Sequence, residues 1–270
     1  MRPTGLKRRH PDVALRYAVT RRYSEILRPP STVFQSVLWI RDQGRRPSCV
    51  GQSFASAVEA FQGYRVSAVD LWTDARRRDG TLAHPDEGTT SESAIESLIH
   101  RGISPYVSGE DERPIVLDTE LCALGQELAA DDARLSPQAE HHVLTSPEQA
   151  VDALLRNLGV CHGGPVNDLY QGLQRDEVVR PKHLTGNAGH ERRLFGYIAS
   201  YDLFLEANSW GPWAGITLLA GFEVPQAFQY AGLVVPAGPL ERAIVLPGAC
   251  WLSPEGLMAS WAVDSIAVLG

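Results

Sequence analysis

A change from loop to helix between residues 42 and 55 constrains the fold of this chain more than any other feature. Residues 42–48 are rich in Gly, Pro and Ser, which form turns. From Cys49 onward, apolar residues recur every three or four positions, and this period predicts a helix with one buried face that runs to about Tyr64. Ser48 is the expected N-cap of that helix. Cys49 is therefore expected in its first turn.

A cysteine in the first turn of a helix has a chemical consequence. The N-terminus of a helix carries partial positive charge and unpaired backbone N–H groups, and both favour the thiolate over the thiol. Because the thiolate is the reactive form, Cys49 is a candidate nucleophile. The alternative is that Cys49 is a small buried hydrophobic residue, and its position alone does not decide between the two.

Two later stretches contain candidate partners for Cys49. They are Gly189-His190, which begins a strand-like run, and Asn208-Ser209-Trp210-Gly211. With Gln43, these residues present Gln, Cys, His and Asn in the order of the papain-like cysteine peptidases, and His190 follows Cys49 within the roughly 130–150 residues typical of that family. Asn208 lies slightly beyond that separation. The chain resembles this family over most of residues 5–220, and in particular its bacterial and phage branch, whose members lack a long propeptide.

The resemblance implies a role for each of these residues. Cys49 would attack a carbonyl carbon, and His190 would hold the thiolate as an ion pair and then protonate the leaving amine. Asn208 would orient the imidazole. Gln43 and the backbone N–H of Cys49 would form the oxyanion hole, where one donor contributes about 3–4 kcal/mol of transition-state stabilisation. Trp210 would shield the contact between Asn208 and His190 from water.

The resemblance also implies the type of substrate. Gly88 and Gly189 fall where relatives bind the backbone of an extended substrate, so a peptide or protein is the expected partner. The implied reaction is hydrolysis of peptide or isopeptide bonds through a thioester, without a cofactor. No metal site is expected, because His141-His142 and Cys161-His162 have no further ligand at a suitable spacing. Phosphate-binding and Gly-x-Ser-x-Gly motifs are also missing from the sequence.

The order of local patterns indicates an α+β protein. Helical patterns dominate before about residue 135 and strand-like patterns after about residue 158. The resemblance implies a papain-like fold of two lobes, one helical with the Cys49 helix at its centre, the other an antiparallel, β-barrel-like lobe. The expected division is a basic N-terminal segment (1–44), a helical lobe (45–135), a β lobe with His190 and Asn208 (136–224) and an apolar C-terminal extension of unknown role (225–270).

Several individual elements are expected from capping and turn signals. The expected helices cover residues 66–78, the segment from a capping box at Thr89 and Glu92 to Gly102, residues 119–133, and a segment that starts at Ser146-Pro147. The expected strands cover residues 194–200, 203–207 and 216–220.

Composition narrows the functional classes. The net charge of −7 argues against nucleic-acid binding, because phosphate backbones are bound through Lys and Arg. Residues 1–28 are an exception, with eight basic residues against two acidic ones, and this basic arm could dock on an acidic surface, although a solvated segment is the simpler interpretation. The sequence shows no recognisable signal peptide, no long apolar run and no paired cysteine spacings. We therefore expect a cytoplasmic protein with reduced thiols and no membrane span.

Departures from the family pattern leave two alternatives open. Glu191-Arg192-Arg193 stand where apolar residues are usual, so either this strand end is exposed or acidic partners meet it from the C-terminal tail or another subunit. The turn after Gly211 is shortened. One alternative is a papain-like acyltransferase, in which an amine resolves the thioester. The other is a structural component of a phage particle or another assembly, virion-associated through the apolar extension or the basic arm, with weak or lost activity.

Overall fold

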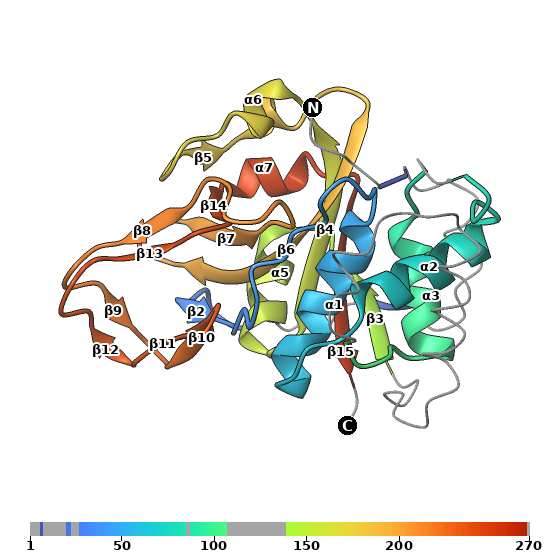
Figure 1. Cartoon of the computed structure of the whole chain (residues 1–270). Coiled ribbons are helices and arrows are strands. Elements are labelled where there is room, and N and C mark those ends of the chain that lie inside the picture. The colour runs from blue at the N-terminus through green and yellow to red at the C-terminus, as the bar shows by residue number, and fades with distance from the viewer. Residues whose placement is uncertain (1–5, 8–19, 23–26, 85–86, 107–138, 269–270) are drawn as a thin grey trace.

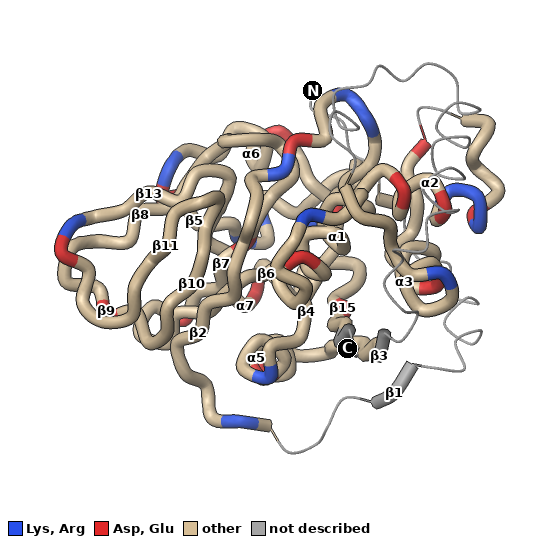
Figure 2. The backbone as a smooth tube through the Cα atoms, turned by 60° about the horizontal axis from the view of Figure 1, so that its bottom comes forward, with Lys and Arg blue, Asp and Glu red and all other residues tan. Residues whose placement is uncertain are grey.

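The computed structural model describes residues 6–7, 20–22, 27–84, 87–106 and 139–268. Three helices lie to one side of a central sheet, and an arm of short hairpins extends from the other side (Figure 1, Figure 2). The helices are α1 (Cys49–Gln62), α2 (Ala68–Asp79), α3 (Ser91–His100), α5 (Pro147–Leu155), α6 (Asp168–Gln171) and α7 (Pro254–Met258). This combination of helices and a mixed sheet confirms the expected α+β class.

Helix α1 begins at Cys49, as the loop-to-helix change predicted. Its first eleven residues are buried, and Gly63 ends the helix in the left-handed conformation that a glycine adopts without strain. The expected cap is wrong in one respect, because the Ser48 side chain makes no capping hydrogen bond. The loop before α1 is held by other contacts, among them a backbone hydrogen bond from Arg46 to Gln43.

Helix α3 starts one residue later than its sequence pattern predicted. The Oγ1 atom of Thr89 donates to Asp79 Oδ2 at 2.5 Å, so it is turned away from the helix that follows. Thr90 is the N-cap instead, and its Oγ1 accepts from the backbone N–H of Ser93 at 3.2 Å. The predicted cap of α5 is confirmed, with Ser146 as N-cap and Pro147 in the first turn.

The central sheet has nine strands. Eight follow the order β1-β3-β15-β4-β6-β7-β14-β5, and β2 pairs with β6. Most pairs are antiparallel, and β1 with β3 and β14 with β5 are parallel. The strands are β1 (Thr20–Arg22), β2 (Val33–Phe34), β3 (Ala139–Val143), β4 (Gly159–Val166), β5 (Val178–Val179), β6 (Ala188–Ile198), β7 (Leu203–Ala207), β14 (Ala249–Leu252) and β15 (Ala262–Val268).

The hairpin arm consists of three small antiparallel pairs at the end of the sheet away from α2 and α3 (Figure 1). They are β8 (Ile216–Leu218) with β13 (Ile244–Leu246), β9 (Glu223–Val224) with β12 (Gly238–Pro239), and β10 (Phe228–Tyr230) with β11 (Leu233–Val235). Of the predicted strands, 203–207 coincides with β7, 194–200 is strand only as far as Ile198 at the end of β6, and 216–220 is strand only over the three residues of β8. The helix predicted over 119–133 lies outside the described residues.

The C-terminal residues belong to the main sheet. Strand β14 lies between β7 and β5, and β15 lies between β3 and β4. Within residues 225–270, β14 and β15 thus join the main sheet and β10 to β13 lie in the hairpin arm, and the proposed domain boundaries stay a prediction. None of the helices in the described segments has the length and apolar character needed to cross a membrane.

Two hydrophobic clusters cover opposite faces of β4 and β6. On β4, Val160 packs into the cluster that contains α5, and Cys161 packs into the cluster that contains α1. Alternate residues of a strand point to opposite faces, so α1 and α5 sandwich these two strands. The side chains in the middle of β6 are buried on both sides as a result.

The contact between α1 and α2 depends on a glycine. A Cβ atom on Gly51 would lie 2.5 Å from the backbone oxygen of Ala68 and 2.8 Å from Trp72 Cβ, and neither atom can move by rotating a side chain. We expect Gly51→Ala to lower the free energy of unfolding by about 1–2 kcal/mol, because overpacking outweighs the better helix propensity of alanine. Urea unfolding measures this change. Gln62→Ala in the same helix is the control, and an equal or smaller loss in Gly51→Ala than in the control would contradict the packing argument.

Candidate active site

His190 and Asn208 come together because β6 and β7 are neighbouring antiparallel strands. His190 is near the start of β6, and Asn208 directly follows β7. The Nε2 atom of His190 lies 2.9 Å from Asn208 Oδ1. Asn208 Oδ1 also accepts from the backbone N–H of Ser209 at 2.6 Å, and its Nδ2 donates to the Tyr170 hydroxyl at 2.8 Å. These three bonds are compatible with one orientation of the amide, in which His190 donates from Nε2.

The imidazole of His190 is buried and neutral. Trp210 stacks on it, with ring centroids 4.3 Å apart and planes 20° from parallel. Burial, followed by the positive charge of Arg192, lowers the pKa of His190 to about 3, although the hydrogen bond with Asn208 opposes this shift. Since Nε2 carries the proton, Nδ1 holds a lone pair, and Nδ1 has no hydrogen-bond partner among the described residues. The ring can therefore accept a proton at Nδ1.

Cys49 is completely buried at the first position of α1, and α1 packs against β6, the strand that carries His190. Its thiol is not part of a disulfide, and the same is true of Cys161 and Cys250. The position at a helix N-terminus, predicted from the sequence, places the sulfur where the helix dipole favours the thiolate.

Gln43 connects the loop before α1 to the turn after β7. Its backbone N–H donates to the Ser209 carbonyl at 2.8 Å, and its side-chain Oε1 accepts from Ser209 Oγ at 2.6 Å. Its Nε2 donates to the Arg46 carbonyl at 2.8 Å. The amide is therefore held at both ends, beside the residue that follows Asn208 and within the loop that leads to Cys49.

An N-terminal segment crosses this region, which the sequence did not predict. The backbone N–H of Leu6 donates to the Gly189 carbonyl at 3.1 Å, and that of Lys7 donates to the Thr89 carbonyl at 2.9 Å. The segment thus lies between Gly189, which precedes His190, and Thr89, which follows Gly88. These contacts use backbone atoms, which any sequence supplies, so no residue pattern could have indicated them.

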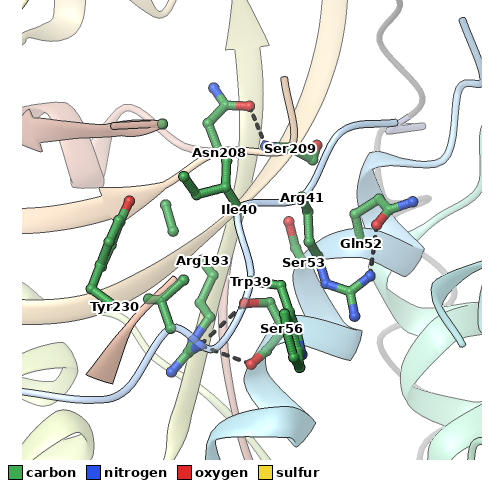
Figure 3. A pocket seen from close by; sticks show the side chains of 13 residues that line it. Trp39, Ile40, Arg41, Gln52, Ser53, Ser56, Arg193, Asn208, Ser209 and Tyr230 are labelled. Atoms are coloured by element: carbon green, nitrogen blue, oxygen red, sulfur yellow. Dashed lines mark hydrogen bonds between the residues drawn. The ribbon is translucent and has the colours of Figure 1, made fainter. Parts of the chain in front are cut away.

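The three consecutive charges on β6 are all buried, and their partners come from within the chain. Glu191 accepts from Ser91 Oγ at 3.0 Å. Arg193 donates to the backbone and side-chain oxygens of Ser56 on α1 at 2.8 and 3.1 Å, in a small pocket between α1 and the sheet (Figure 3). Arg192 lies on the opposite face, 3.8 Å from Glu206 on β7. The expectation of an exposed strand end, or of partners from the tail or another subunit, is therefore wrong.

No group of three or more His, Cys, Asp or Glu side chains suited to a metal ion occurs within the described segments. Two of the histidines that the sequence analysis considered as metal ligands have other neighbours. His141 Nε2 lies 2.8 Å from Asp264 Oδ1, and His162 Nδ1 lies 3.0 Å from Ser260 Oγ.

This fold, with α1 packed on a sheet that carries the histidine and asparagine, is the papain-like fold of cysteine proteases. Over all of this chain and 98% of the other, it resembles xylellain, a cysteine protease from Xylella fastidiosa, with a TM-score of 0.65 and 15% sequence identity. A Carica candamarcensis cysteine protease, CMS1MS2, in complex with E-64 has a TM-score of 0.56 and 19% identity over 88% of this chain and 97% of that one.

A third solved structure, procathepsin L 3 of the Tenebrio molitor larval midgut, gives a TM-score of 0.56 and 19% identity over 91% of this chain and 73% of that one. No family model matches the sequence, and no curated protein does. The resemblance seen in the sequence is thus confirmed at the level of the fold. Assignment to a bacterial or phage branch stays a prediction.

The lowered pKa of His190 makes stability depend on pH. Between an unfolded pKa of about 6.5 and the folded value of about 3, the unfolded chain binds the proton and the folded chain does not. We therefore expect the free energy of unfolding to fall as the pH drops through this window, by up to about 1.4 kcal/mol per pH unit for one histidine. Urea unfolding between pH 7 and pH 4 measures the slope.

His190→Gln should reduce that slope, and part of it should remain because burial also lowers the pKa of His162. His100→Gln, at the exposed end of α3, is the matched control and should keep the wild-type slope. If His190→Gln and His100→Gln have the same pH dependence, His190 is not the buried neutral base described above.

Proposed function

We propose that this chain is a cysteine peptidase that hydrolyses peptide or isopeptide bonds, with Cys49 as nucleophile, His190 as base and acid, and Asn208 as the residue that orients the imidazole. The observation that carries the proposal is the hydrogen bond from His190 Nε2 to Asn208 Oδ1 under Trp210, which leaves the lone pair on Nδ1. A buried helix-N-terminal cysteine on the element packed against β6 supplies the thiol that such a base would serve.

The steps follow from these groups. His190 Nδ1 takes the proton from Cys49 Sγ, and the thiolate adds to the carbonyl carbon of the scissile amide. The Cys49 backbone N–H and the Gln43 side chain donate to the oxygen that becomes negative. The imidazolium then protonates the leaving nitrogen, which departs and leaves a thioester on Cys49. A water molecule, deprotonated by His190, attacks the thioester and releases the acid and the free thiol.

We propose Gly88 and Gly189 as the positions that hold the substrate backbone. Leu6 and Lys7 lie between the segments that contain these two positions, and their N–H groups donate to the Gly189 and Thr89 carbonyls. Gly189 has no room for a Cβ atom, because the backbone of Leu6 and the ring of Trp261 lie against it. An extended substrate peptide would use the same two carbonyl acceptors, and so it would have to displace this segment.

The assembly alternative keeps part of its support. It rested on an apolar tail in need of cover, and β14 and β15 are covered inside the chain's own sheet, whereas Leu233, Val234 and Val245 of the hairpin arm are exposed. The acyltransferase alternative differs from the peptidase only in what attacks the thioester. Turnover of a peptide substrate in the presence of an added primary amine separates the two, because the amine appears in the product only if it resolves the thioester.

The proposed nucleophile can be tested by alkylation with iodoacetamide followed by mass spectrometry. A free thiol has a pKa of about 8.5. Below pH 8 we expect Cys49 to react faster than such a thiol, and we expect His190→Ala to slow Cys49 to the rate of a free thiol. Cys161 and Cys250 are internal controls, since burial raises the pKa of both thiols. If Cys49 follows an ordinary thiol titration in both proteins, the proposed pair does not operate.

Removal of residues 1–7 should uncover the site. We expect the deletion to raise the rate of Cys49 alkylation and of peptide hydrolysis severalfold, because the Gly189 and Thr89 carbonyls become available. Lys7→Ala is the matched control: it removes the ion pair with Glu87 but keeps the backbone N–H. Equal rates for the deletion, the control and the wild type would contradict a covering role for this segment.

A further inference from the structure

A chain of hydrogen bonds continues from Asn208 into the interior, away from His190. Asn208 Nδ2 donates to the Tyr170 hydroxyl at 2.8 Å, and that hydroxyl donates to Glu206 Oε1. Tyr170 comes from α6 and Glu206 from β7, and each is fully buried. The third residue of the candidate site is thus connected through a phenol to a buried carboxylate.

Glu206 is held as a carboxylate by its surroundings. Burial alone would raise its pKa, but the positive charge of Arg192 and contacts with His162 and Tyr170 lower it to about 2. The groups that face its oxygens are His162 Nε2 at 3.0 Å, Arg192 Nε at 3.8 Å and Cys250 Sγ at 3.1 Å. A carboxylate only accepts hydrogen bonds, so its neighbours in this cluster must present donors.

This requirement sets a direction along the whole chain of bonds. The Tyr170 hydroxyl has one proton, which it gives to Glu206, and so toward Asn208 it can only accept. Asn208 must then turn its NH2 group to Tyr170 and its oxygen to His190. The oxygen can bond only to a protonated Nε2, which leaves the lone pair of a neutral imidazole on Nδ1.

We propose that Tyr170 and Glu206 are positioning residues, which act through Asn208 to keep the proton of His190 on Nε2 and its lone pair on Nδ1. This inference rests on the proposed function of His190 as the base for Cys49. Without the Tyr170 hydroxyl, only the backbone N–H of Ser209 would still favour this orientation of the amide, and a rotation of Asn208 by 180°, which makes it donate to Nε2, would cost less. The imidazole proton would then lie on Nδ1, the atom that has to accept the proton of Cys49.

The ring of Tyr170 has a separate, structural role that the test must leave intact. It packs against Trp210 and Trp213, with centroids 5.7 and 5.2 Å away, and lies 5.2 Å from the guanidinium carbon of Arg192. Tyr170→Phe keeps these contacts and removes only the hydroxyl oxygen. Tyr197→Phe is a matched control, because Tyr197 belongs to the same hydrophobic cluster and donates to a carboxylate, Asp202, at 2.8 Å without any connection to Asn208.

The first experiment compares these two variants in the full chain, with peptide hydrolysis and Cys49 alkylation as readouts. We expect Tyr170→Phe to lower kcat and the alkylation rate by about tenfold or more with little change in KM, and Tyr197→Phe to leave both near the wild-type values. Equal losses in the two variants, or no loss in Tyr170→Phe, would overturn the proposal.

A double-mutant cycle then asks whether Tyr170 acts through Asn208. In the Asn208→Ala background there is no amide to orient, so Tyr170→Phe should have no further effect on the alkylation rate. A loss as large as in the wild-type background would mean that Tyr170 acts by another route, and the proposal would fail.

The tautomer of His190 can be measured by 15N NMR of the imidazole nitrogens near pH 7. In the wild-type protein this measurement requires neither catalytic activity nor a variant that folds. The proposal requires Nε2–H in the wild type, and a predominant Nδ1–H form would overturn it. Loss of the Nε2–H preference in Tyr170→Phe supports it further. If Cys49 of the wild type shows no enhanced alkylation while the Nε2–H tautomer depends on Tyr170, the proposed peptidase fails and the positioning of His190 stands.

Discussion

The burial of β6 on both faces is the constraint on which the rest of the structure depends. The strand lies between β4 and β7, and α1 and α5 cover its two sides. Every residue from Gly189 to Ile198 is buried, although four consecutive members of this run are titratable. Each of these side chains needs a polar or charged neighbour, because an unpaired charge in the interior costs several kcal/mol.

The alternation of side chains along β6 divides these groups into two sets. On the α1 side, Glu191 and Arg193 bond to hydroxyl and carbonyl groups of Ser91 and Ser56 and so join the helices to the sheet. On the other side, His190 and Arg192 face Tyr170, Trp210 and Glu206. The same strand therefore attaches the helical layer on one face and holds His190 with its aromatic and charged neighbours on the other.

Arg192 and Glu206 are buried charges next to His190, and each depends on the other. Its guanidinium nitrogens have no hydrogen-bond partner among the described residues, and its charge is balanced by Glu206 and by the face of the Tyr170 ring. Its positive charge also lowers the pKa of His190 and that of Glu206. Arg192 thus favours the neutral imidazole of His190. Glu206 neutralises the charge of Arg192 and sets the direction of the hydrogen bonds through Tyr170 to Asn208.

Patterns in the sequence were enough to predict the α+β class, the helix that starts at Cys49, and the contact of His190 with Asn208 next to Trp210. These features depend on short-range periodicity and on the order of Gln, Cys, His and Asn along this chain, and the fold itself is shared with a solved structure at 15% identity. The sequence did not predict which residues would be the partners of Glu191, Arg192 and Arg193. It also did not predict that β14 and β15 join the main sheet, or that the segment at Leu6 lies beside Gly189. Those features depend on which distant residues meet across the sheet. Tyr170 and Glu206 look like ordinary helix and strand positions in the sequence, and only the tertiary structure brings their side chains together as a hydrogen-bonded support for Asn208.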